Sequence, residues 1–200
     1  MVATLSAFSG RASALEANLK VRAIQGPADA LPGLDISGSV AGPLSPDSRH
    51  AWFAFAQVRQ SWAQSYMGVN WTVRPWLSVW AAAGVQQNGG EWLEQVNLGL
   101  AATVRDAVQV SIDIETDRRL IVHGDIDALW YELALTAKVA ERLSVGMRAR
   151  SGFGTGPYLE AFLSPAVRLF AAWLPVSHEI WRAGSASDLR SWYAGLTFVL

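Results

Sequence analysis

Apolar and polar residues alternate with a period of two along most of the chain. Between Ala14 and Gln25, for example, one face carries Leu15, Ala17, Leu19, Val21 and Ala23, and the residues between them are Glu16, Asn18, Lys20 and Arg22. This period is typical of a β-strand with one apolar face, whereas the spacing of three and four residues that marks an amphipathic helix is nowhere sustained. The alternation predicts about twelve strands, at about 14–25, 34–41, 50–58, 62–73, 76–86, 92–104, 108–115, 129–139, 143–150, 158–164, 167–176 and 191–200.

The connections between the expected strands differ in length on the two sides. Most turns after even-numbered strands are short, whereas long loops at 25–33, 117–127 and 177–188 follow odd-numbered strands. Asn88-Gly89 has the residue types of a tight hairpin turn. The long turn at 42–49 and the short one at Arg59-Gln60 are exceptions. Short turns on one side and longer loops on the other are typical of transmembrane β-barrels of bacterial outer membranes.

The last strand, Ser191 to Leu200, alternates, carries aromatic residues and ends on an apolar residue. In this it resembles the closing strand of a bacterial outer-membrane β-barrel, although Leu200 stands where Phe is the commonest ending. The resemblance is to an architecture and covers nearly the whole chain. It implies a closed antiparallel up-and-down transmembrane β-barrel over 14–200 in the bacterial outer membrane, preceded by a tail over 1–13. It also implies contact with lipid and lipopolysaccharide, and recognition of the last strand by the outer-membrane assembly machinery.

Composition supports a transmembrane β-barrel and limits the possible binding partners. A net charge of −1 gives no basic surface for nucleic acid, and the absence of cysteine excludes disulfides and thiolate metal sites. No apolar run reaches the roughly 18 residues of a membrane-spanning helix. The start of the chain lacks an intact signal peptide, so we expect either a mature form or the C-terminal barrel of a longer protein with an upstream periplasmic domain. A soluble all-β domain, such as a Trp-rich carbohydrate binder, is the alternative.

Ten tryptophans are many for 200 residues. Their positions in the alternation place some on the apolar face of a strand and others on the interior face. Trp collects where a membrane meets water, because its ring is apolar and its N–H is polar. Five lie on the apolar face near strand ends and are expected to form an aromatic girdle: Trp52, Trp71, Trp92, Trp173 and Trp192. Four have the parity of the barrel interior: Trp62, Trp76, Trp80 and Trp130.

Ionisable residues of both signs share the interior parity. The expected pore-lining residues are Glu16, Lys20, Arg22, Asp113, Glu115, Glu132, Lys138, Arg148, Arg150, Glu160 and Arg168. Fixed charges around a pore sort solutes by sign. The same residues would instead fill and stiffen the barrel if they pair with one another, because a twelve-stranded barrel has an intermediate diameter.

Few residues favour catalysis or cofactor binding. Of the three histidines, His50 is expected at a strand end, and His123 and His178 in long loops. Outer-membrane phospholipase and lipid A deacylase resemble the chain in size and barrel class, but no catalytic motif of either is present. Asp117, Asp125 and Asp127 lack the spacing of a calcium loop. The glycine clusters precede no helix and are read as hairpin turns, so no metal, cofactor or enzyme activity is expected.

The sequence therefore predicts a passive pore or export conduit for small polar or charged solutes, with a lumen lined by Arg and Asp/Glu. Two alternatives remain. One is a non-conducting barrel with a structural, adhesive or receptor role in its outer loops, which dense packing of Trp80, Trp130, Phe162 and Phe170 would favour. The other is a hydrolase acting on lipids of the outer leaflet.

Overall fold

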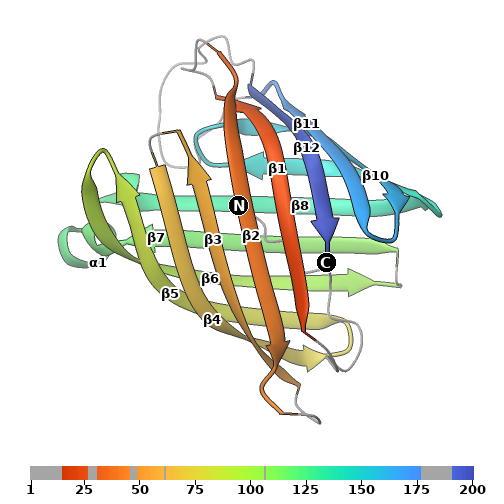
Figure 1. Ribbon diagram of the computed structural model, residues 1–200, viewed down its shortest axis with the longest axis horizontal. Helices are drawn as coiled ribbons and strands as arrows, with labels where there is room; N and C mark the ends of the chain where they lie inside the picture. Colours follow the sequence, from red (N-terminus) through yellow and green to blue (C-terminus); the bar gives the residue numbers. More distant parts are fainter. Residues whose placement is uncertain (1–14, 27–30, 46–48, 61, 106, 177–190) are drawn as a thin grey trace.

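The computed structural model describes residues 15–26, 31–45, 49–60, 62–105, 107–176 and 191–200. These residues form a closed antiparallel barrel in which each strand pairs with its neighbours in sequence and β12 returns to β1 (Figure 1). The predicted all-β barrel of about twelve strands is confirmed. Within the described ranges, no helix is long and apolar enough to cross a membrane.

The twelve strands formed by the described residues follow the predicted segments closely. They are β1 (Glu16–Gln25), β2 (Gly33–Pro43), β3 (His50–Arg59), β4 (Trp62–Arg74), β5 (Leu77–Asn88), β6 (Glu91–Val104), β7 (Val108–Asp117), β8 (Leu129–Ala140), β9 (Leu143–Arg150), β10 (Gly154–Ser164), β11 (Val167–Leu174) and β12 (Ser191–Val199). Most boundaries agree within two residues because the turn residues interrupt the alternation sharply. β10 begins four residues earlier than expected: Gly154 and Gly156, read as part of a turn, belong to the strand.

The closing strand completes the barrel as predicted. β12 pairs with β1 from Asn18–Val199 to Gln25–Trp192, and with β11 on its other side. Across this seam the Trp192 indole N–H donates to Gln25 Oε1 at 2.9 Å. Closure leaves no unpaired strand edge, which a β-structure in a lipid bilayer requires.

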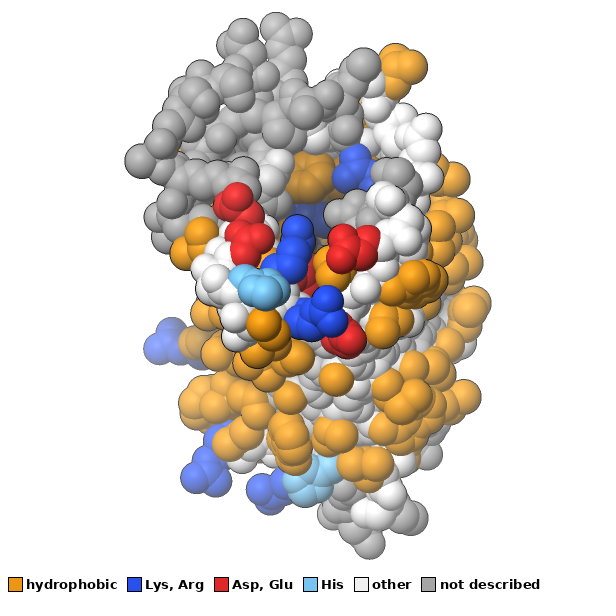
Figure 2. All heavy atoms as spheres, turned by 90° about the vertical axis from the view of Figure 1, so that its left-hand side faces the viewer, with side chains coloured by type: hydrophobic (Ala, Val, Ile, Leu, Met, Phe, Trp, Pro, Cys, Tyr) orange, Lys and Arg blue, Asp and Glu red, His pale blue; other side chains and the backbone are white. Residues whose placement is uncertain are grey.

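Side chains alternate between the outer wall and the interior. Outward Leu19, Met67, Leu98 and Leu135 are exposed, and Figure 2 shows hydrophobic side chains over the sides of the barrel. Inward positions are polar, aromatic or small, and most are buried. An apolar outer face around a polar interior is the inverse of a soluble barrel and matches a lipid-exposed wall.

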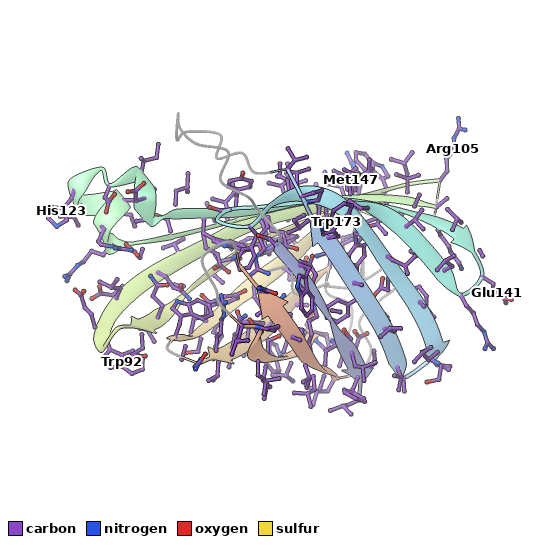
Figure 3. The ribbon with its side chains drawn as sticks, turned by 90° about the horizontal axis from the view of Figure 1, so that it is seen from above. Trp92, Arg105, His123, Glu141, Met147 and Trp173 are labelled. Atoms are coloured by element: carbon purple, nitrogen blue, oxygen red, sulfur yellow. The ribbon has the colours of Figure 1, made fainter. Side chains whose placement is uncertain are left out.

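The two ends of the barrel differ. The α1 end carries the β1–β2, β3–β4, β5–β6, β7–β8, β9–β10 and β11–β12 connections, whereas the terminal end carries the start of β1, the end of β12 and the other connections. Figure 3 shows Trp92 and His123 at the α1 end, and Arg105 and Glu141 at the opposite one. At the α1 end Gly89 and Gly90 adopt positive φ angles of 59° and 92°, as the hairpin prediction required.

Two local details differ from the sequence-based expectation. The β7–β8 segment, expected only as a long loop, contains α1 (Arg118–His123) and the 3-10 helix η1 (Ile126–Ala128). Both are too short for a helical period to show in the sequence. Trp76 was placed in a strand with interior parity, but it lies in the β4–β5 turn and is 55% exposed, because β5 begins only at Leu77.

Candidate pore interior

An ion cluster on β8 and β9 lies inside the barrel. Arg148 Nη1 donates to Glu132 Oε1 at 2.5 Å, and Arg150 Nη1 lies 3.8 Å from Glu132 Oε2. Glu132 is only 1% exposed, and both arginines are buried. Strand pairing aligns the groups, since Glu132 is the register partner of Arg150. One buried carboxylate therefore compensates two guanidinium groups.

The arginines of this cluster also contact aromatic rings. The guanidinium of Arg148 lies 3.9 Å from the centroid of the Tyr158 ring, and that of Arg150 lies 5.2 Å from Trp130 and 4.8 Å from Phe153. Cations over aromatic faces are attracted by the ring quadrupole, more strongly where water is excluded. The cluster is thus held by ion pairs and by ring contacts.

A second polar chain crosses from β1 to β4. Arg22 donates to Asp35 Oδ2 at 3.0 Å, and the Gln57 amide donates to the same carboxylate oxygen. The Gln64 amide then donates to Gln57 Oε1 at 3.3 Å. Arg22 was a predicted pore-lining residue, but Asp35 and the two glutamines were not singled out. The signal that could have identified these three residues is the alternation, which places each of them on the interior side of its strand.

Asn97 on β6 joins the aromatic and acidic parts of the interior. Its Oδ1 accepts from the Trp80 indole at 2.9 Å, and its amide donates to Asp113 at 2.7 Å and to Glu115 at 3.3 Å. Gly99, next on the same face, makes room for the Trp80 ring: a Cβ at Gly99 would collide with the indole and with the Ile112 carbonyl. The missing side chain at Gly99 therefore leaves space for the indole position that makes the hydrogen bond.

These contacts define two walls. We call Asp113, Glu115, Glu132, Arg148 and Arg150 of β7–β9 the charged wall, and Gln57, Gln64, Gln86, Gln95 and Asn97 of β3–β6 the amide wall. All ten have interior parity, and all except the half-buried Gln86 are buried.

The remaining predicted pore-lining residues lie nearer the terminal end. Glu160 and Arg168 form an ion pair at 4.0 Å, and the Lys20 ammonium lies 5.3 Å from the Phe170 ring centroid. Glu16 and Lys138 are exposed, near the ends of their strands. The predicted residues are therefore brought together in groups rather than in one continuous ring.

Among the described residues, the buried aromatic side chains inside the barrel form two separate clusters. Phe53, Phe55, Tyr66 and Trp80 pack together with Trp62 and Trp130 against them, whereas Phe170 packs with Tyr158 and Tyr193. Phe162 lies under Arg168, with 5.1 Å between the guanidinium and the ring centroid. Trp80, Trp130, Phe162 and Phe170 are thus spread over the interior and do not make one plug.

A cavity of about 270 Å³ lies between the two walls toward the α1 end. Figure 2 looks onto this end and shows Lys/Arg and Asp/Glu side chains around a hollow. The cavity lining comprises Asp35, Gln57, Arg59, Trp62, Gln64, Gln86, Gln95, Glu115, Thr116, Asp117, Arg119, Asp127, Ala128, Trp130 and Arg150. It is mostly hydrogen-bonding in character, with two indoles.

Two of the three loop aspartates, Asp117 and Asp125, accept hydrogen bonds that cap short helices. Asp117 caps α1 by accepting from the Arg119 backbone N–H at 2.8 Å, and Asp125 caps η1 through Asp127 N–H at 3.0 Å. The Arg119 guanidinium also binds the Asp117 carboxylate through two nitrogens, which raises the pKa of Arg119. No cluster of three or more His, Cys, Asp or Glu within the described ranges has the arrangement of a metal site.

The five expected girdle tryptophans are on the outward face. Trp92, Trp173 and Trp192 lie toward the α1 end, and Trp52 and Trp71 toward the terminal end. Trp92 is 66% exposed and Trp173 is similarly exposed, whereas Trp52 and Trp192 are half-buried. Aromatic side chains therefore occur on the outer wall near both ends, the arrangement that the girdle interpretation needs.

The histidines are far from one another. The His50 ring packs edge-on against Trp71, with centroids 6.3 Å apart, at the terminal end. His123 is exposed at the end of α1, and the expectation for His178 lies outside the described residues. The structure does not bring the two described histidines into one site.

Comparison with known proteins gives structural matches only. No protein-family model matches the chain, and no curated protein matches it in sequence. Solved structures do match. One is a KdgM porin in complex with disordered oligogalacturonate, with a TM-score of 0.57, 9% identity, and coverage of 90% of this chain and 98% of that one.

Two further matches have different titles. A bacterial polysaccharide outer membrane secretin aligns with a TM-score of 0.51 and 11% identity over 94% of this chain and 98% of that one. The outer membrane phospholipase A from Escherichia coli aligns with a TM-score of 0.56 and 10% identity over 92% and 88%. Porins, a secretin and one phospholipase thus share this architecture. The chain has the fold of the twelve-stranded β-barrels of the bacterial outer membrane.

Proposed function

We propose that the barrel is a passive pore for small polar or charged solutes across the outer membrane. The observation that carries this proposal is the polar interior: the charged wall faces the amide wall, and the cavity between them lies toward the α1 end. Fixed charges inside a pore lower the barrier for solutes that they attract and raise it for others. Apolar side chains alone would suffice to fill a purely structural barrel.

The structural matches are compatible with this function. Two of these matches are titled KdgM porin and bacterial polysaccharide outer membrane secretin. At 9–11% identity these likenesses concern the fold, so the proposal for this chain depends on its own interior residues.

Single-channel recording in planar bilayers tests the pore. We expect discrete conductance steps from the purified barrel, and a reversal potential in a KCl gradient that depends on the interior charges. Glu132→Gln should shift the potential toward anion selectivity, and Arg150→Gln toward cation selectivity. The matched controls are Glu141→Gln and Arg142→Gln in the exposed β8–β9 turn, which change the net charge equally.

Folding is checked for every variant by heat-modifiable migration in gels. Arg168→Gln, nearer the terminal end and less buried than the charged wall, serves if a charged-wall variant does not fold. Silent bilayers from barrels that migrate as folded would overturn the proposal.

A second candidate is a non-conducting barrel that acts through the loops at its α1 end. The observation that favours it is the burial of the charged wall, in which Glu132, Arg148 and Arg150 pair with one another instead of facing water. The bilayer experiment separates the two candidates directly.

We propose no enzyme activity. A hydrolase needs a nucleophile and a base in hydrogen-bond reach. Of the two histidines that the structure describes, His50 packs against an outer-wall tryptophan and His123 is exposed on a loop helix. The phospholipase match shares only the fold at 10% identity. Turnover of phospholipid vesicles by the purified barrel would contradict this.

A further inference from the structure

We propose that the cavity at the α1 end is a binding site for an uncharged sugar or polyol. This inference deepens the pore proposal, on which it rests, by naming the class of solute that enters. It depends on four features of the cavity: its amides, its unpaired polar atoms, its two indoles and its charge balance.

The amides come from four consecutive strands. Gln57, Gln64, Gln86 and Gln95, on β3, β4, β5 and β6, all line the cavity. Each carboxamide carries both a donor and an acceptor, as does each hydroxyl of a sugar. A surface of neighbouring amides can therefore pair with successive hydroxyls, whereas an ion would use only half of each amide.

Several buried polar atoms of the lining have no hydrogen-bond partner within the described part of the protein. They are Gln64 Oε1, Gln95 Nε2, Asp35 Oδ1, and Nε and Nη1 of Arg150. All four side chains are at least nine-tenths buried, and all four line the cavity. A buried polar group without a partner is unfavourable, because it has lost its bonds to water and gained none in the protein. Donors and acceptors on a bound solute would satisfy them.

Two tryptophans supply apolar surface beside these groups. Trp62 and Trp130 line the cavity, and the Trp62 indole donates to Gln86 Oε1 at 3.3 Å, which orients its ring. A pyranose ring has C–H groups on its faces and hydroxyls around its edge. An aromatic face beside convergent polar groups is the usual composition of a small-molecule site and suits both parts of the sugar.

The charges around the cavity largely compensate one another. Asp35 pairs with Arg22 at 3.0 Å, and Asp117 pairs with Arg119 at 2.7 Å. The other charged lining residues are two arginines and two acids: Arg59, Arg150, Glu115 and Asp127. A strongly charged solute would have to compete with these pairs, whereas a neutral solute would not. The volume of about 270 Å³ lies just below the range of about 300–1,000 Å³ for small-molecule sites, which suits a small solute such as one or two sugar rings.

Binding to the purified full chain tests the inference. Glucose and maltose are titrated as neutral probes, and glucuronate and glucosamine as charged ones, by isothermal titration calorimetry and tryptophan fluorescence. We expect saturable binding of a neutral probe at least tenfold tighter than that of its charged analogue. Gln64→Leu and Gln95→Leu should each weaken it at least tenfold.

The matched control is Gln109→Leu. Gln109 has the same interior parity but lies on β7 near the terminal end, outside the cavity. Gln86→Ala changes a half-buried residue of the same lining and serves if a buried variant does not fold. Equal binding of all four probes, or binding unchanged in every cavity variant, would overturn the inference.

The two proposals fail separately. A conducting barrel that binds none of the sugars overturns the sugar site and leaves the pore. Saturable sugar binding to a barrel that gives silent bilayers overturns the pore and assigns the cavity to a receptor.

Discussion

The charged wall and the amide wall face the same interior but are stabilised differently. In the charged wall, Glu132 is shared by two buried arginines, so removing one group leaves an uncompensated charge. In the amide wall, neutral groups pass hydrogen bonds from strand to strand, as from Gln64 to Gln57. The comparison indicates that the charged wall is the more sensitive to single substitutions, and that the amide wall is better suited to exchange partners with a solute.

The largest effect is expected for Glu132→Gln. This change leaves Arg148 and Arg150 buried without their carboxylate, and breaking a buried ion pair costs about 3–5 kcal/mol. The free energy of unfolding, measured by urea titration in lipid vesicles with tryptophan fluorescence, should fall by that amount. Glu141→Gln, in an exposed turn, should change it by less than about 0.5 kcal/mol. Equal effects would contradict the difference between a buried and an exposed carboxylate.

A smaller loss is expected for Asn97→Leu in the amide wall. The variant removes the acceptor of the Trp80 indole and the donor to Asp113 and Glu115, so three buried groups lose a partner. We expect a loss of about 3 kcal/mol in the same unfolding measurement. Asn70→Leu is the control, because Asn70 is equally buried but its Oδ1 has no partner among the described residues. A control that loses as much as Asn97→Leu would show that the hydrogen bonds of Asn97 do not matter.

Gly99→Ala tests whether the Trp80 ring position is fixed by a glycine. The added methyl group would displace the indole, and such overpacking costs about 1–3 kcal/mol. The fluorescence emission maximum of Trp80 should also shift. This is measured in a variant in which the other tryptophans are replaced, so that the emission comes from Trp80 alone. Gly38→Ala is the control, since a Cβ there meets only the Asn18 carbonyl at 3.6 Å. If the stability of Gly99→Ala is unchanged, the Trp80 indole can shift aside without cost, and the space at Gly99 is not required.

The smallest effect is expected at the rim of the cavity. Arg119→Ala removes the two-nitrogen contact with Asp117, but Arg119 is 43% exposed and solvent screens the pair. The loss should be below about 1 kcal/mol and should shrink further in high salt. Arg118→Ala is the control, because its pair with Glu94 is longer, at 3.7 Å, and more exposed. A loss as large as that of Glu132→Gln would contradict the contrast between rim and interior.

Much of the architecture is readable in the sequence because a barrel wall separates two environments. Each strand must place apolar residues toward one side and polar residues toward the other, so its alternation shows both its extent and the direction of every side chain. The seam between β1 and β12 follows, since Asn18 to Gln25 and Trp192 to Val199 are the first and last alternating segments. The charged residues of β7–β9 were identified from the same parity.

The tertiary structure decided which interior side chains lie together, which the alternation along a single strand cannot show. The alternation places Gln64 and Gln95 inside the barrel, but it does not predict that they line the same cavity as Trp62 and Trp130. Their positions along the barrel axis depend on the stagger of neighbouring strands. Asp117 was one of three loop acids in the sequence, and the fold makes it the cap of α1 and the partner of Arg119.

The sequence by itself therefore determined the strands, the two faces of the wall and the charges inside it, since these depend on the period of two. Only the tertiary structure decided which interior groups meet, which polar atoms are left unpaired and where a cavity lies. The physical reason is that these contacts depend on the register and curvature of the closed sheet, which couple residues far apart in the chain.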